Sequence, residues 1–249
     1  SLFHNPRYRM NILLDDISFK NALFPFGQVR SVSHTRCGIL SIFEKWQFYF
    51  PGKVYIASEK MIRDFDELNC IKYPASFIPS NEFLKELSFK KEKIPFTPDC
   101  KILEHPWQIF QNNNWAIHQD FEMITAGRIS GKIPPGNQSV CAEKVFIEPG
   151  ATISFSILNA ESGPIYIGKN AMIEEGCLLR GPISIGEGSR LKMGTRIYGA
   201  TTIGPYCLAG GEIKNSVLTG YSNKGHDGYL GDSVIGEWCN LGAGTSNSN

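Results

Sequence analysis

Aliphatic side chains recur every six residues through the second half of the chain. An α-helix buries a side chain every 3.6 residues and a flat strand every second residue, so a period of six fits neither. It fits short strands joined by turns at the corners of a triangular prism, with three repeats to a coil. We therefore predict a left-handed parallel β-helix of hexapeptide repeats over residues 141–249. The repeated positions are Ile167, Ile173, Leu179, Ile185, Leu191, Ile197 and Ile203, followed by the weaker Ala209.

The first half has a different pattern, which predicts an α/β domain. Short apolar runs at 10–14 and 54–57 indicate two buried strands, and residues 39–50 between them have the apolar spacing of a helix. This order favours a strand–helix–strand unit with parallel strands. A second helix is expected at 107–121, followed by a polar stretch with Gly and Pro. We expect the α/β domain at 1–125, a linker at 126–140 and the β-helix at 141–249.

The sixfold phase is lost after residue 214 and returns at Ile235. This break predicts a loop that protrudes from the coil, with polar side chains among glycines. Polar residues on a loop held by a rigid scaffold are a common place for function. The sequence after Thr245 has no capping pattern, so the β-helix is expected to be incomplete at its C-terminus.

Charge and composition exclude several partners. Lys and Arg number 25 against 24 Asp and Glu, and no basic cluster suits a run of phosphates, so nucleic acid is not an expected partner. The sequence has neither a run of about 20 apolar residues nor the apolar core of a signal peptide, so we expect a cytoplasmic protein without a membrane partner.

The seven cysteines are scattered and never form a CxxC pair, so neither a disulfide framework nor a metal site is expected. Cys177, Cys207 and Cys239 stand at the small inward position of the repeats, which explains these three thiols as packing residues.

The segment GHDGYLGDSVIGEWCNLGAGT at 225–245 carries a specific resemblance. It resembles the acetyltransferase half of the bifunctional N-acetylglucosamine-1-phosphate uridylyltransferase/glucosamine-1-phosphate N-acetyltransferases, and the likeness extends over about residues 140–249. The first half, through RCGILSIFEKW at 36–46 and WQIFQNNNWAIHQDFEMITAGRISG at 107–131, is similar to a GlmU-like group of sugar nucleotidyltransferases. Short solenoids need capping or association, and the resemblance implies a homotrimer.

The resemblance implies roles for five residues. His226 matches the general base that accepts a proton from the amino group of the sugar; an imidazole, with an ordinary pKa of about 6.5, suits this role at neutral pH. Lys214 matches the lysine that holds the sugar phosphate, and Arg196 a second phosphate-binding side chain. Tyr229 and Asn249 match residues that contact the sugar. The alternative for His226 is a solvent-exposed loop histidine without a catalytic role.

The chain departs from these relatives in two places. The acetyl-CoA groove of the family is completed by later coils and a C-terminal tail that this sequence lacks, so the cofactor-binding residues are unknown. In the first half, the strand MNILL leads into DDISFKNALFPFGQVR, which lacks the glycine-rich phosphate loop of nucleotidyltransferases. Arg36, Lys45, Asp15 and Asp16 are candidates for phosphate and Mg²⁺, or they are solvated charges.

Three functions remain open. The leading one is acetyl-CoA-dependent N-acetyl transfer to an amino-sugar phosphate on the β-helix. The second is nucleotidyl transfer to a sugar 1-phosphate by the first domain, with Mg²⁺ and a nucleoside triphosphate, the β-helix serving as a trimerisation scaffold. The third is a non-catalytic assembly subunit.

Overall fold

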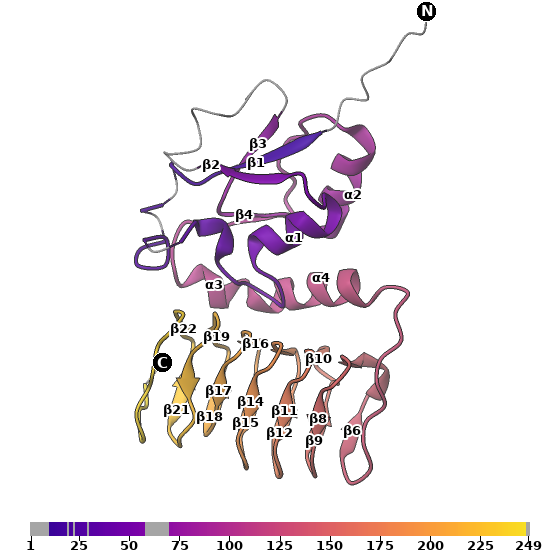
Figure 1. The fold of residues 1–249 in the computed structure, drawn as a ribbon, viewed down its shortest axis with the longest axis vertical. Coiled ribbons are helices and arrows are strands. Elements are labelled where there is room, and N and C mark those ends of the chain that lie inside the picture. Colours follow the sequence, from indigo (N-terminus) through magenta and orange to yellow (C-terminus); the bar gives the residue numbers. More distant parts are fainter. Residues whose placement is uncertain (1–9, 19, 22, 29, 58–69, 248–249) are drawn as a thin grey trace, which may run out of the picture. The chain divides into compact units, whose positions relative to one another are not determined.

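The computed structural model describes residues 10–18, 20–21, 23–28, 30–57 and 70–247 (Figure 1). The chain divides into two compact units, neither of which is one continuous segment. Unit 1 comprises Ser1–Thr35 and Ser41–Glu104, and unit 2 comprises Arg36–Leu40 and His105–Asn249. The boundaries predicted from the sequence, 1–125, 126–140 and 141–249, therefore differ from this division.

Unit 1 contains the predicted strand–helix–strand arrangement. Strand β1 (Asn11–Asp15) lies between β2 (Val54–Ala57) and β3 (Cys70–Pro74), and both pairs are parallel. Helix α1 (Ile42–Tyr49) connects β1 to β2 and begins three residues later than predicted, because Ser41 and Glu44 form a capping box at its start. The expected α/β class of this part is confirmed.

The remaining elements of unit 1 were not predicted. Two of them pack on Trp46 through Phe77 and Phe83, whose ring centroids lie 6.0 and 6.3 Å from that of Trp46. Trp46 is fully buried and also stacks on Tyr73 with the ring centroids 5.2 Å apart. The charged stretch at 83–93 covers most of a helix that begins after the Ser80 cap. These elements are η1 (Val32–His34), β4 (Phe77–Ile78), α2 (Asn81–Lys90) and β5 (Lys101–Ile102), with β4 and β5 antiparallel.

The second half forms a parallel β-helix, as predicted. Three parallel sheets make its walls, and each sheet takes one strand from each successive coil. We name the sheets by their first strands. The β6 sheet holds β6 (Gln138–Val140), β9 (Ile157–Asn159), β12 (Leu178–Arg180), β15 (Arg196–Tyr198), β18 (Glu212–Lys214) and β21 (Tyr229–Gly231). The β7 sheet holds β7 (Val145–Ile147), β10 (Ile165–Ile167), β13 (Ile183–Ile185), β16 (Thr201–Ile203), β19 (Val217–Leu218) and β22 (Val234–Ile235). The β8 sheet holds β8 (Thr152–Ile153), β11 (Met172–Ile173), β14 (Arg190–Leu191), β17 (Leu208–Ala209) and β20 (Asn223–Lys224). A short helix, η3 (Ala142–Lys144), precedes β7.

The aliphatic residues of the sixfold series fill the interior of the prism. All eight, from Ile167 to Ala209, are at most 2% exposed. Small polar residues near the corners have a second role, because their side chains accept backbone N–H groups from the next coil. Cys207 donates its N–H to Ser189 Oγ at 2.9 Å, and Cys239 donates to Ser222 Oγ at 3.0 Å. The corners are therefore satisfied by side chains as well as by backbone.

The prediction of a protruding loop between residues 214 and 235 is wrong. Residues 217–218, 223–224 and 229–231 are strands that continue the three sheets in register. The phase changes because the coils shorten: Ile185 pairs with Ile203 18 residues later, whereas Ile203 pairs with Leu218 only 15 residues later. The shorter coils have fewer residues at their corners, and their strands stay paired. A change in the sixfold spacing of aliphatic residues therefore does not require a protruding loop.

None of the seven cysteines, all of which lie in the described residues, forms a disulfide. Burial raises the pKa of Cys207 to about 11. Cys177 and Cys207 are buried in the prism as predicted. Cys239 is exposed. Its exposure follows from its place in the last described coil, which has a neighbouring coil on one side only, so its inward packing stays a prediction.

Two helices belong with the β-helix. Helices α3 (Gln108–Gln111) and α4 (Asn113–Thr125) replace the single helix predicted at 107–121. Asn113 is fully buried: its Nδ2 donates to the carbonyl of Ala200 at 2.8 Å, and its Oδ1 accepts from Gly38 N at 2.7 Å and Thr202 Oγ1 at 3.1 Å. Asp120, one per cent exposed, accepts the N–H groups of Ile39 and Leu40. Buried hydrogen bonds thus join residues 36–40, α4 and the β-helix within unit 2.

A lysine stands inside the apolar prism. Lys224 pairs with Ala209, which pairs with Leu191, so the three occupy one inward column of the β8 sheet. Lys224 is 2% exposed, and its Nζ donates to the carbonyls of Gly210 at 3.2 Å and His226 at 2.7 Å. The small Ala209 side chain leaves room for the lysine stem. Burial lowers the pKa of Lys224, against a smaller opposing effect of the Asp227 charge.

We predict that Asn113→Ala lowers the free energy of unfolding by about 3 kcal/mol, because it removes the partner of the buried Gly38 N–H and of the Ala200 carbonyl. The Thr202 hydroxyl loses one of its two acceptors and keeps the Gly38 carbonyl. Urea denaturation of the full chain measures this. The matched control is Asn114→Ala, at the next, exposed position of the same helix, for which we expect a change within about 0.5 kcal/mol. Equal effects of the two substitutions would contradict the assigned network.

We predict that the free energy of unfolding of the native protein, minus that of Lys224→Met, increases with pH. The folded state lowers the pKa of this lysine below its ordinary 10.5. Between the two pKa values the unfolded chain binds more protons, so the free energy of unfolding increases with pH, by at most about 1.4 kcal/mol per pH unit. Urea denaturation at three pH values between 7.5 and 10 measures the difference. The exposed Lys169 provides the control, since Lys169→Met should show no such slope; a flat or falling difference for Lys224→Met would reject the prediction.

Candidate functional site

The outward face of the β6 sheet carries two parallel rows of side chains. Strand pairing places equivalent residues of successive coils side by side, and alternate residues of a strand share a face. The first row is Ile157, Leu178, Arg196, Glu212 and Tyr229. The second row is Asn159, Arg180, Tyr198 and Lys214, in which Arg180 and Tyr198 each follow the paired residues Leu179 and Ile197.

Three of the predicted site residues lie on this face. Arg196, Lys214 and Tyr229 belong to the consecutive strands β15, β18 and β21, with Arg196 next to Glu212 and Glu212 next to Tyr229. Lys214 is half-buried. The sequence therefore selected residues that the fold brings together, although it placed Lys214 and Tyr229 on a loop. Asn249 lies outside the described residues.

His226 lies at the corner between β20 and β21, and its side chain is exposed. The corner is held from inside by Lys224, which donates to the His226 carbonyl. It adjoins the start of β18: the Glu212 N–H donates to the carbonyl of Gly228 at 3.2 Å. A Cβ on Gly211 would come within 3.0 Å of the His226 carbonyl oxygen, so glycine permits this close approach of two coils. His226 is therefore at the edge of the face that carries the other predicted residues.

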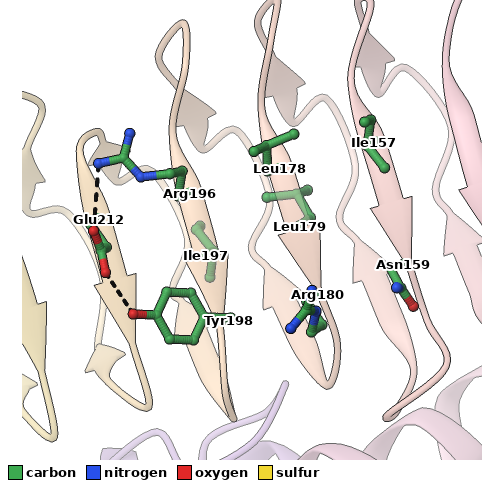
Figure 2. A pocket seen from close by; sticks show the side chains of 9 residues that line it. All are labelled: Ile157, Asn159, Leu178, Leu179, Arg180, Arg196, Ile197, Tyr198 and Glu212. Carbon is green, nitrogen blue, oxygen red and sulfur yellow. Dashed lines mark hydrogen bonds and ion pairs between the residues drawn. The ribbon is translucent and has the colours of Figure 1, made fainter.

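A groove of about 450 Å³ crosses this face over β9, β12, β15 and β18 (Figure 2). Its residues combine apolar side chains with two arginines and a carboxylate: Ile157, Asn159, Leu178, Leu179, Arg180, Arg196, Ile197, Tyr198 and Glu212. Leu179 and Ile197 point into the prism, where they are 2% and 1% exposed, whereas Leu178 and Ile157 are 46% and 40% exposed. The groove thus has an apolar part at β9 and β12 and a charged part at β15 and β18.

Glu212 organises the charged part of the groove. Its Oε1 accepts a hydrogen bond from Tyr198 Oη at 2.5 Å, and its Oε2 lies 3.5 Å from Arg196 Nη2 (Figure 2). The bond to Glu212 raises the pKa of Tyr198 to about 12, so the hydroxyl stays protonated and donates at neutral pH. At 3.5 Å the contact of Arg196 is long, and this arginine is exposed, so an anionic ligand can compete with Glu212 for it.

Sequence reasoning did not identify Arg180, Tyr198 or Glu212. The signal that could have found them is register: residues 18 apart share a row while the coils keep their length, which relates Leu178 to Arg196. Beyond Arg196 the spacing falls to 16, which relates it to Glu212. Without knowledge of the shortened coil, the second relation cannot be read from the sequence.

The candidates of the first half are engaged in structural contacts. Asp15 Oδ2 lies 3.3 Å from Lys72 Nζ and its Oδ1 accepts the Ile17 N–H. Asp16 is buried and accepts the Val32 N–H at 2.7 Å. Lys45 is 2% exposed, and Arg36 donates to the carbonyls of Thr219 and Ile39. The two carboxylates of unit 1, which already accept hydrogen bonds, do not fit a Mg²⁺ site in the described residues.

The described part of the chain contains neither a cluster of metal-ligating side chains nor a membrane-spanning helix. No group of three or more His, Cys, Asp or Glu side chains there is arranged to hold a metal ion. None of its helices combines the length and apolar character needed to cross a bilayer.

Comparison with known proteins gives a family for the first half. Residues 11–78 and 65–129 match the family described as sugar nucleotidyl transferase. No curated protein matches the chain. The match runs past the end of unit 1 at Glu104 and includes α3 and α4, which pack with the β-helix. Together with the β-helix, the family match supports a transferase of the sugar-nucleotide pathway. From residue 11 to 129 the chain matches the sugar nucleotidyl transferases, and a parallel β-helix follows that is consistent with the acetyltransferase part of GlmU-like proteins.

Proposed function

We propose that the β-helix transfers an acetyl group from acetyl-CoA to the amino group of an amino-sugar phosphate. The observation that carries this proposal is the position of Arg196, Lys214 and Tyr229 on three consecutive strands of one outward face, at whose edge lies the exposed His226. This face therefore offers two cations that can bind a phosphate and a tyrosine hydroxyl that can contact a sugar. The imidazole that can accept a proton from an amine lies at its edge.

His226 has the role of general base in this mechanism. An ammonium group has no lone pair, so the amine must lose a proton before or during its attack on the thioester carbonyl. The nitrogen–carbon bond forms and the carbon–sulfur bond breaks, so the proton passes to the imidazole and the thiolate leaves as the coenzyme A thiol after protonation. No covalent intermediate with the protein is needed.

Arg196 and Lys214 hold the phosphate. Arg196 offers a planar guanidinium and Lys214 a compact ammonium, a combination that suits a phosphate dianion. Tyr198 stays protonated and keeps Glu212 engaged, which limits the repulsion between this carboxylate and the phosphate. Tyr229 and Asn249 orient the sugar. The proposal includes a homotrimer and a cytoplasmic location.

The family match supports a second candidate function, nucleotidyl transfer by the first half of the chain. In that reaction the phosphate of a sugar 1-phosphate attacks the α-phosphate of a nucleoside triphosphate, and pyrophosphate leaves. The Asp15 and Asp16 contacts described above do not supply a site for the Mg²⁺ that this reaction would use.

We predict that the full chain releases coenzyme A thiol from acetyl-CoA when glucosamine 1-phosphate is present, and that His226→Ala slows this release by about 10²-fold or more, because a positioned base contributes 10²–10⁴. A thiol-reactive dye measures the rate. His105→Ala, at an exposed position, is the control and should leave the rate unchanged. Release that survives His226→Ala would reject the assigned base.

Pyrophosphate release separates the two candidate functions. If the full chain with Mg²⁺ and a panel of nucleoside triphosphates releases pyrophosphate only when a sugar 1-phosphate is added, the first half is a nucleotidyltransferase. If thiol and pyrophosphate release are both absent and sedimentation shows a trimer, the chain is a non-catalytic assembly subunit.

A further inference from the structure

The groove on the β6 sheet is longer than a sugar monophosphate requires. Arg196 and Lys214 lie on β15 and β18, but the groove continues over β12 and β9. Neighbouring strands are about 4.8 Å apart, so four strands span about 14 Å, and Tyr229 on β21 adds one more spacing. A monophosphate at Arg196 and Lys214 would leave the half of the groove at Arg180, Leu178 and Ile157 without a ligand.

Arg180 is a second arginine in this groove. It is exposed, and no hydrogen bond or ion pair engages its side chain within the described residues. Tyr198 lies between Arg180 and Lys214 in the second row. Tyr198 pairs directly with Lys214. Arg180 and Tyr198 are neighbours because each directly follows one of the paired residues Leu179 and Ile197. Arg196 lies on the same strand as Tyr198, two residues before it. Three cationic residues are therefore neighbours of Tyr198 in the sheet. Among the residues that line the groove, Glu212 is the only carboxylate.

This spread of charge suits two singly charged phosphates better than one dianion. A phosphate monoester concentrates its charge on three oxygens of one group, which one arginine and one lysine can hold. A diphosphate diester divides a similar charge between two neighbouring groups, and a cation for each then contributes. Arg196 with Lys214 and Arg180 provide such a division across adjacent strands.

The apolar end of the groove fits a nucleoside. Leu178 and Ile157 are partly exposed side by side in the first row, two residues along their strands from Arg180 and Asn159 (Figure 2). Asn159 pairs with Arg180. Its Oδ1 accepts the Glu161 N–H at 2.9 Å, which orients the amide so that its Nδ2 can donate to a base. Ligand sites commonly combine an apolar lining with a few polar groups that fix orientation.

We propose that the groove binds the nucleoside diphosphate of a nucleotide-activated sugar, with Arg180 as a phosphate-binding residue. The placement of the sugar toward Tyr229 and His226 rests on the proposed function, but binding of the nucleoside diphosphate does not. Nucleotidyl transfer to a sugar 1-phosphate is the class of reaction that supplies such a ligand, and the family match of residues 11–129 is of that class. Coenzyme A also contains a nucleoside diphosphate, so the test must separate the two.

Calorimetric titration of the full chain with UDP, ADP, GDP and CDP, and with their monophosphates, tests the proposal. We expect at least one diphosphate to bind about tenfold more tightly than its monophosphate. Arg180→Ala should abolish this preference, and Arg180→Lys should retain part of it. Lys169→Ala removes an exposed cation outside the groove and should change nothing.

A second variant addresses the apolar end of the groove. Leu178→Asp places a carboxylate two residues before Arg180 and beside Arg196 on the paired strand. The Leu178 side chain is already 46% exposed, so the fold should persist, which thermal unfolding checks. It should weaken the same diphosphate by about tenfold. Diphosphate binding that is identical in the native chain, Arg180→Ala and Leu178→Asp would overturn the proposal, because that binding would belong to another part of the chain. Loss of coenzyme A binding in Arg180→Ala, with the four diphosphates unaffected, would overturn it too.

The two proposals can fail separately. If the native chain releases thiol with glucosamine 1-phosphate but Arg180→Ala changes the affinity for none of the diphosphates, the proposed acetyl transfer stands and the proposed nucleotide site does not. If Arg180→Ala removes the diphosphate preference but no acceptor promotes thiol release, the site stands and acetyl transfer does not.

Discussion

The parallel pairing between successive coils is the constraint on which the rest of unit 2 depends. Each strand of two or three residues is too short to hold its position alone, so its backbone must bond to the coils on both sides while an apolar side chain fills the prism. Ile185, bonded between Ile167 and Ile203 and fully buried, meets both demands. Where a coil shortens, residues are removed from the corners and the pairing is kept. The register between neighbouring strands is therefore kept, although the six-residue spacing in the sequence is lost.

The same pairing produces the candidate site. Because every inward residue has outward neighbours along its strand, stacking of coils lines up outward side chains that are 15 to 21 positions apart in the sequence. Arg180, Tyr198 and Lys214 become neighbours in this way, without a loop or a helix to position them. The rigidity of a groove built on paired backbone suits ligand recognition, since its side chains need little reorganisation. His226 differs, since it lies at a corner, and Lys224 fixes that corner from within the prism.

Much of the fold could be predicted from the sequence, because it depends on local pattern. The sixfold aliphatic series predicts the β-helix, and the strand–helix–strand order predicts the parallel sheet of unit 1. The protruding loop was a wrong interpretation, since the period alone does not distinguish an insertion from shortened coils. Packing between distant segments left no periodic signal: Asn113 and Asp120 bind residues 36–40 from about 75 and 80 positions away. Arg196, Lys214, Tyr229 and His226 were found through resemblance, whereas Arg180 needed the register of the structure.

The discontinuity of unit 2 has a practical consequence for dissecting the chain. A fragment that begins at residue 105 would include α4 and every described strand of the β-helix but omit Arg36–Leu40. The Asp120 carboxylate would then lose the two backbone donors that the structure gives it from Ile39 and Leu40, and Asn113 would lose its bond from Gly38. Separating the two halves by simple truncation would therefore damage the half that is kept. A usable fragment has to carry the five-residue segment with it, for instance joined to its N-terminus by a flexible linker.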